Sequence, residues 1–97
     1  MVLPVVACAV DDDFQPINEP FSLVTRDISP NSIGLIHIDQ FEDKLLALEM
    51  AIAGEKISVV AEIMWQRSMG PLFYYSGARF VAKLDYLPSE QSLGVRA

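Results

Sequence analysis

The chain has 97 residues, enough for one domain with a modest core, and 52% of them are hydrophobic, which excludes an intrinsically disordered protein. The formal net charge of −6 disfavours non-specific binding to nucleic acid and to anionic membranes, so we expect neither as a partner. No apolar run reaches the roughly 18–20 residues of a membrane helix, and residues 1–10 lack the basic start of a signal peptide. The single cysteine, Cys8, excludes an internal disulfide and fits a cytoplasmic setting.

The first part of the chain predicts three strands separated by polar turns. Residues 2–10 are rich in valine and run into three consecutive aspartates, which are typical of a solvated loop rather than of a calcium loop with alternating ligands. Residues 21–27 alternate apolar and polar side chains, and residues 33–38 form the next apolar run. The sequence Ser-Pro-Asn-Ser at 29–32 predicts a tight turn between these two strands.

Residues 41–53 are ambiguous because they combine good helix formers with a strand-like alternation. Leu46, Leu48, Met50 and Ile52 would share one strand face, and the following run 57–66 alternates in the same way. A short turn that contains Gly54 separates the two runs. We therefore predict a β-hairpin rather than a helix.

The last part of the chain predicts one further strand over residues 72–84, after a turn at 68–71. Residues 87–97 contain proline, serine and glycine and are expected to form a C-terminal tail, so the domain spans residues 1–86. About six strands in so short a chain favour a small barrel or sandwich.

The segment Thr25–His37 resembles a signature of the PilZ domain family, Asp/Asn-x-Ser-x-x-Gly followed by an apolar strand. Ile63–Arg67 is similar to the family's penultimate strand, and Gly77–Val81 is similar to its closing Gly-x-x-Phe strand. The resemblance covers roughly residues 2–84. It implies a small six-stranded antiparallel β-barrel and a bacterial regulatory module that senses cyclic di-GMP.

The resemblance also implies which residues hold the ligand. Asp27 and Ser29 match the signature and would bond to the guanine edge or the phosphates, while Ser32 stands where the family has glycine. If that position requires positive φ, serine costs about 1–2 kcal/mol there, and Asn31 would adopt the left-handed conformation instead.

The family's other signature, Arg-x-x-x-Arg ahead of the first strand, is absent because no arginine precedes Arg26. Two guanidinium groups at that place would grip phosphates and stack on guanine. Either the chain is a fragment cut after the motif, or the protein never had it. Arg26 and Arg79 are the candidate replacements, which would complete a ligand-binding set of Arg26, Asp27, Ser29, Asn31, Ser32 and Arg79.

Structural interpretations of the same residues remain open. Asp27 and Ser29 would cap the turn through bonds to backbone groups. Arg26 would pair with a nearby acid, and it would face away from Asp27 unless the backbone bends. Arg79 would be a solvated cross-strand residue. The aromatic residues Trp65, Tyr74, Tyr75 and Phe80 could form a stacking surface, but we expect them in the core and barrel wall.

His37 is the only histidine, which makes a zinc site improbable, and no metal is expected. A catalytic role would need a nucleophile such as Ser29 or Cys8 beside it, so we expect no enzyme.

These observations give an all-β, PilZ-like barrel with a signalling role, whose cyclic di-GMP binding is weakened or lost. The alternative is a PilZ-like domain that binds no nucleotide and acts through contact with a protein partner. An incompletely closed barrel would leave an edge that supports an oligomer. The expected core is Val5, Leu23, Ile33, Leu35, Leu46, Leu48, Val59, Ala61, Ile63 and Phe80.

Overall fold

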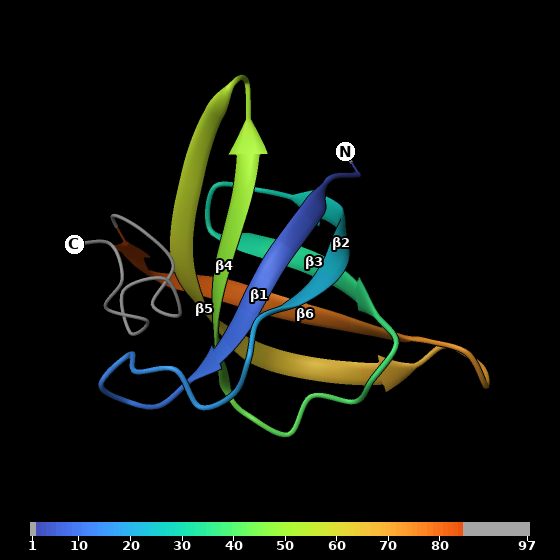
Figure 1. Ribbon diagram of the computed structural model, residues 1–97. Helices are drawn as coiled ribbons and strands as arrows, with labels where there is room; N and C mark the ends of the chain where they lie inside the picture. The colour runs from blue at the N-terminus through green and yellow to red at the C-terminus, as the bar shows by residue number, and fades with distance from the viewer. Residues whose placement is uncertain (1, 85–97) are drawn as a thin grey trace.

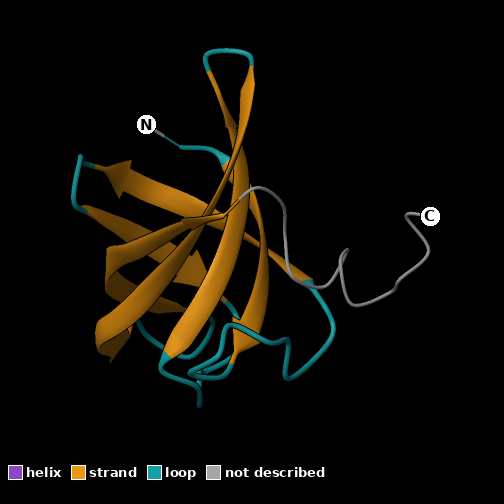
Figure 2. Ribbon diagram, turned by 90° about the vertical axis from the view of Figure 1, so that its left-hand side faces the viewer, coloured by secondary structure: helices purple, strands orange, loops and turns teal. Residues whose placement is uncertain are grey.

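Six strands and no helix make up the regular structure of residues 2–84, which the computed structural model describes (Figures 1 and 2). The predicted tail, 87–97, and the last two residues of the predicted domain lie outside these residues. The strands are β1 (Pro4–Val10), β2 (Phe21–Ile28), β3 (Ser32–His37), β4 (Leu45–Ile52), β5 (Glu55–Ser68) and β6 (Tyr74–Leu84). The segment 41–53, which could have been a helix, is therefore mostly strand. Residues 2–84 contain no helix that is long and apolar enough to cross a membrane.

The strands form a closed antiparallel barrel in the order β1-β2-β3-β6-β5-β4, which confirms the expected fold class. Closure follows because β1 pairs with both β2 and β4. The expectation of an incompletely closed barrel is wrong, since every strand has two neighbours. The predicted β4–β5 hairpin is confirmed, and it projects beyond the barrel in Figure 1. Ala53 and Gly54 in its turn have φ values of 53° and 81°, as hairpin turns of this kind require.

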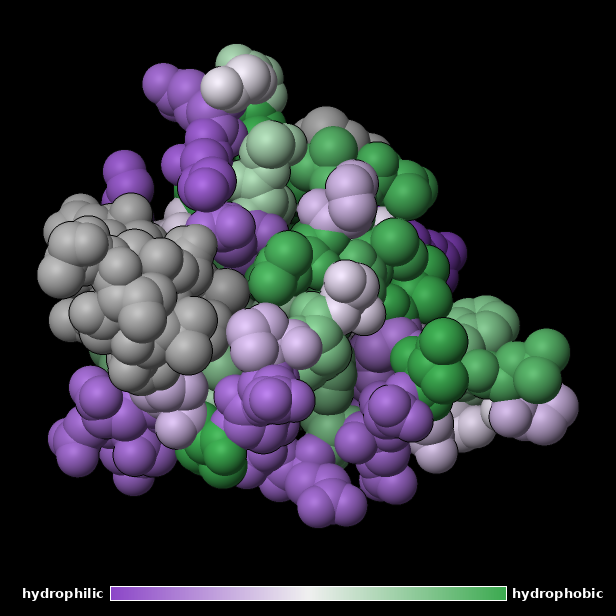
Figure 3. Space-filling view, in the orientation of Figure 1, coloured by the Kyte–Doolittle hydropathy of each residue, from purple (hydrophilic) through white to green (hydrophobic). Residues whose placement is uncertain are grey.

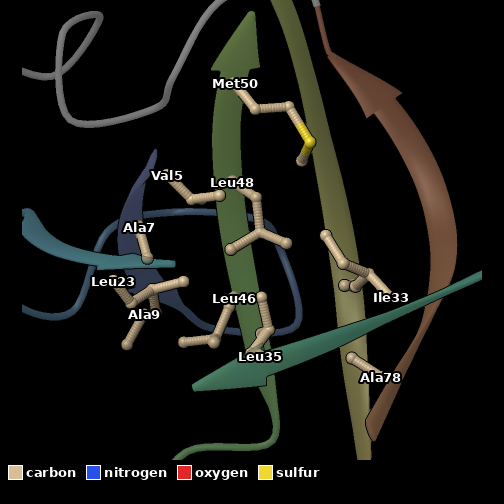
Figure 4. Packing of buried hydrophobic residues seen from close by; sticks show 11 residues of the cluster. Val5, Ala7, Ala9, Leu23, Ile33, Leu35, Leu46, Leu48, Met50 and Ala78 are labelled. Carbon is tan, nitrogen blue, oxygen red and sulfur yellow. The ribbon is translucent and has the colours of Figure 1, made fainter. Parts of the chain in front are cut away.

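The core fills the barrel with aliphatic side chains from every strand (Figure 4). Side chains alternate along each strand, so one residue in two points inward. Of the ten residues expected in the core, seven are buried there, whereas Val59, Ile63 and Phe80 pack against it while partly exposed. The buried members of the expected set are Val5, Leu23, Ile33, Leu35, Leu46, Leu48 and Ala61.

Bulges in β2 and β5 change which side chains face out. A bulge between Ile63 and Trp65 adds one residue to β5, so that Met64 and Trp65 are 57% and 44% exposed. Strict alternation would have placed Trp65 on the same face as Ile63, in the core. The bulge places it instead on the barrel wall, the other location expected for the aromatic residues. The bulge turns the chain's only tryptophan toward solvent.

Two loops, residues 11–20 and 38–44, cover the lower end of the barrel in Figure 1. The first is fixed by the backbone N–H of Ile17, which donates to the Ala9 carbonyl at 2.8 Å. The second is fixed by Gln66, whose side chain accepts from the N–H of Phe41 at 2.7 Å and donates to its carbonyl at 3.1 Å. The side-chain amide of Gln66 thus bonds to Phe41 as the backbone of a neighbouring strand would. These two bonds hold Phe41 against the end of the core.

Candidate functional site

A bulge in β2 places two charged residues of the signature segment on the same side of the barrel. Thr25 pairs with Leu35 of β3, and Asp27 pairs with Gly34, so Arg26 is the extra residue between them. Thr25 is fully buried, whereas Arg26 and Asp27 are both exposed. Arg26 lies on the same side as Asp27 because the backbone bends at this bulge, which is the one condition under which it was not expected to face away.

Two glycines lie side by side on the outer face next to Asp27, since Gly34 of β3 pairs with Gly77 of β6. A Cβ atom at Gly34 would lie 2.7 Å from Oδ1 of Asp27, and one at Gly77 would lie 2.4 Å from the Trp65 indole. Both distances are shorter than a carbon atom tolerates. The two glycines therefore allow the Asp27 carboxylate and the Trp65 ring to lie directly against the sheet.

Arginine and aromatic side chains meet in a continuous row over this glycine pair. The guanidinium carbon of Arg26 lies 4.8 Å from the centre of the Tyr75 ring, and that of Arg67 lies 5.5 Å from the centre of the Trp65 ring. Trp65 and Tyr75 meet edge to face, with centroids 5.1 Å apart. The Tyr75 hydroxyl donates to Oδ2 of Asp27 in a long bond of 3.4 Å. We call these five residues, Arg26, Asp27, Trp65, Arg67 and Tyr75, the outer wall.

The arginines of this face differ in their partners. Neither Arg26 nor Arg67 forms an ion pair with a carboxylate of residues 2–84, so Arg26 lacks the expected acidic partner within this part of the chain. Arg79 is bound instead: its Nε and Nη2 both lie 2.8 Å from Oε1 of Glu62. Lys44 also contacts Glu62, at 2.9 Å. Hydrogen bonds from Lys44 and then from Arg79 lower the pKa of Glu62, so this group stays ionised and keeps Arg79 engaged.

Two serines of the turn between β2 and β3 bond to each other. The hydroxyls of Ser29 and Ser32 are 2.7 Å apart, and the Ser29 N–H donates to the Ser32 carbonyl at 2.9 Å. The Asn31 carbonyl accepts from the N–H of Phe80 at 2.9 Å. Ser29 therefore stabilises the turn, as the structural interpretation held, whereas the side chain of Asp27 contacts Tyr75 instead.

The expected backbone strain at this turn is wrong. Among the described residues other than glycine, only Phe14 and Ala53 have positive φ, so neither Asn31 nor Ser32 is left-handed. Ser32 begins β3 in extended conformation, which serine adopts at no cost.

Of the six residues expected to bind ligand, the structure brings Arg26 and Asp27 together, and both side chains are exposed to solvent. Ser29 and Ser32 bond to each other, Asn31 supports the closing strand through its backbone, and Arg79 is held by Glu62. The sequence did not single out Arg67, and it offered Trp65 and Tyr75 only as part of a stacking surface, not as neighbours of Arg26 and Asp27. Glycine inside a strand often marks close approach by another group, so Gly34 and Gly77 were the signal that could have located them.

A second polar cluster lies at the lower end of the barrel around His37, which is 5% exposed. Its Nε2 lies 2.7 Å from the hydroxyl of buried Ser76, and its Nδ1 lies 2.6 Å from the Asp39 carbonyl. Burial lowers the pKa of His37, which favours the neutral ring, and Phe41 stacks on it at 3.6 Å. Neither Ser29 nor Cys8 is the hydroxyl or thiol beside His37.

The one thiol, Cys8, is buried and lies 3.2 Å from the Asn18 carbonyl. Burial raises the pKa of this thiol, which disfavours the reactive thiolate. Within residues 2–84, no group of three or more histidine, cysteine or carboxylate side chains is arranged to hold a metal ion.

Comparison of the chain with protein-family models, with curated proteins and with solved structures finds no match.

Proposed function

We propose that this chain is a PilZ-type regulatory module whose outer wall binds cyclic di-GMP weakly. The observation that carries the proposal is the pair of guanidinium groups, Arg26 and Arg67, held over aromatic rings beside Asp27. The ligand has two phosphates and two guanine bases, and these groups match the chemistry of the wall.

The arginines supply the phosphate contacts in this account. A guanidinium group fixed over a ring has lost part of its freedom before binding, and its in-plane donors remain available for phosphate oxygens. Because no described carboxylate pairs with Arg26 or Arg67, neither must give up an ion pair when a phosphate arrives. Arg67, rather than Arg79, is therefore the second replacement for the missing Arg-x-x-x-Arg signature.

Asp27 and Trp65 supply the contacts to guanine. A carboxylate accepts two hydrogen bonds from the Watson–Crick edge of guanine, and an exposed indole offers a stacking surface worth about 1–3 kcal/mol per base. The flat approach that Gly34 and Gly77 permit keeps both groups close to the sheet. Binding is weakened because the hydroxyls of Ser29 and Ser32 bond to each other and Arg79 bonds to Glu62.

Titration calorimetry with cyclic di-GMP tests the proposal. We expect a saturable heat with the unchanged chain, and about a tenfold or greater loss of affinity in Asp27→Ala, since a hydrogen bond to a charged group contributes roughly 1.5–3 kcal/mol. Arg67→Gln should weaken binding as well, and Arg79→Gln is the matched control because its guanidinium is already held by Glu62. Absence of heat from a folded protein would end the nucleotide-binding account.

A second candidate function is a protein contact on the same wall without nucleotide. It is favoured by the exposure of Met64 and Trp65, two large apolar residues in succession, since aromatic residues, methionine and arginine are enriched where proteins meet. Its distinguishing result is a folded chain that gives no heat with cyclic di-GMP and whose Trp65 fluorescence does not respond to it. Saturable quenching of Trp65 would instead favour the nucleotide.

A further inference from the structure

A pocket of about 420 Å³ opens at the lower end of the barrel, away from the outer wall. It lies between the end of β3, the loop 38–44 and the start of β2, and its size is within the range of small-molecule sites. Part of the lining is apolar and aromatic: Phe21 and Phe41 have ring centroids 6.0 Å apart, and Leu46 of the core lines the pocket with them. Figure 3 shows hydrophilic residues gathered at this end of the molecule.

Hydrogen bonds and ring stacking hold two aromatic residues of the pocket in place. His37 is held by Ser76 on one side of its ring and by the Asp39 carbonyl on the other, and Phe41 stacks on it. Gln66 bonds to both backbone groups of Phe41. The aromatic part of the pocket is thus already in place before anything binds, which reduces the cost of ordering it.

Three carboxylates line the same pocket, and they carry a charge that nothing in it balances. Asp39, Glu42 and Asp43 all belong to the lining, which contains no lysine and no arginine. None of the three forms an ion pair with a cation of residues 2–84. A pocket whose lining is apolar and aromatic and also carries unbalanced negative charge is complementary to a cation with an apolar body.

We infer that this pocket binds a small organic cation, a protonated amine on an aromatic or aliphatic body. The apolar body would sit against Phe21, Phe41 and Leu46, and the ammonium group would lie among the three carboxylates. The pocket shares no residue with the outer wall. A test of this inference is therefore independent of a test of the proposed function.

The test is a titration of the isotope-labelled chain with benzylamine hydrochloride at pH 7.5, followed by NMR. We expect saturable shifts at the backbone amides of Phe21, His37 and Phe41. Benzyl alcohol, which has the same ring and no charge, should bind more weakly. Equal binding of the alcohol, or absence of shifts at these residues, would overturn the inference.

A charge-matched pair of variants separates a local site from the general charge of the protein. The pocket variant carries Asp39→Asn, Glu42→Gln and Asp43→Asn, and the control carries Asp12→Asn, Asp13→Asn and Glu19→Gln, none of which lines the pocket. We expect the affinity for benzylamine to fall about fivefold in the first and less than about twofold in the second. Equal losses in both would contradict the inference.

A third arm identifies the source of the cation. Nα-acetyl-arginine amide presents a guanidinium group as a peptide side chain does. We expect it to bind less tightly than benzylamine, because its polar amide groups do not suit the aromatic lining. Tighter binding of the arginine amide would assign the pocket to a partner protein and would overturn the small-molecule assignment.

Discussion

The outer wall and the end of the barrel hold aromatic side chains in opposite ways. On the wall, Trp65 and Tyr75 lie outside the sheet over glycines and support guanidinium groups. At the end of the barrel, His37 and Phe41 stack with each other in a pocket that three acidic residues also line. One small barrel thus carries a basic surface and an acidic pocket, and the aromatic groups are structural in one place and exposed in the other.

The largest effect on stability is expected at the end of the barrel, from His37→Leu. Ser76 is fully buried, and without the histidine its hydroxyl loses its partner, at a cost of about 2–3 kcal/mol. Urea unfolding measures the change. The double variant His37→Leu, Ser76→Ala removes both polar groups and should recover part of the loss. A loss below about 0.5 kcal/mol in the single variant would show that this bond is not structural.

A somewhat smaller effect is expected on the wall, from Gly77→Ala. The new Cβ would lie 2.4 Å from the indole of Trp65, so the ring must move away from the sheet. We expect a loss of about 1–3 kcal/mol and a red shift of the tryptophan emission. Gly70→Ala is the control, because its strain comes from a φ of 90° in open space and should leave the emission unchanged. Unchanged emission in Gly77→Ala would contradict the close contact.

Near pH 6.5, the pH dependence of stability should report on His37 at the end of the barrel, because Glu62 titrates at lower pH and Cys8 at higher pH. Burial lowers the pKa of His37 below its ordinary value of 6.5, so the unfolded chain takes up the proton first as the pH falls. The stability that the neutral ring contributes is therefore present above pH 6.5 and is lost below it, until the folded protein is also protonated. Between pH 8 and pH 5, the melting temperature of the unchanged chain should therefore fall more steeply than that of His37→Asn, so that the two curves approach each other below pH 6.5. Parallel curves would show that His37 titrates alike in both states.

The smallest effect is expected from Arg67→Gln, which removes the guanidinium group over Trp65. An exposed cation–π contact contributes about 0.5–1 kcal/mol, so stability should change by no more than that. The variant thereby separates binding from folding on the wall, since ligand affinity should fall while urea unfolding hardly changes. A loss above about 2 kcal/mol would mean that Arg67 supports the fold.

The sequence was sufficient to predict the fold, because apolar and polar residues alternate along most strands and residues typical of turns separate them. It was insufficient for the outer wall because bulges at Arg26 and Met64 shift that alternation by one residue. A bulge is decided by pairing with a neighbouring strand, and pairing between β5 and β6 is not encoded in either strand alone. The partner of Arg79 was missed for a similar reason, since Glu62 lies on the strand beside it.

The pocket could not be predicted either. It is formed where residues from four separate parts of the chain meet, and Phe41 is placed there by Gln66, which lies 25 residues further on. No local pattern around Phe41 indicates that pairing. The acidic residues 39, 42 and 43 were visible in the sequence, but only the closure of the barrel brings them into one pocket lining with the aromatic residues.

The most direct test of the account is an NMR titration of the labelled chain with cyclic di-GMP. We predict saturable shifts at Arg26, Asp27, Tyr75 and the indole N–H of Trp65, with the amides of His37 and Phe41 unchanged. Shifts confined to the pocket, or no shifts at all from a folded chain, would contradict the assignment of the nucleotide to the outer wall.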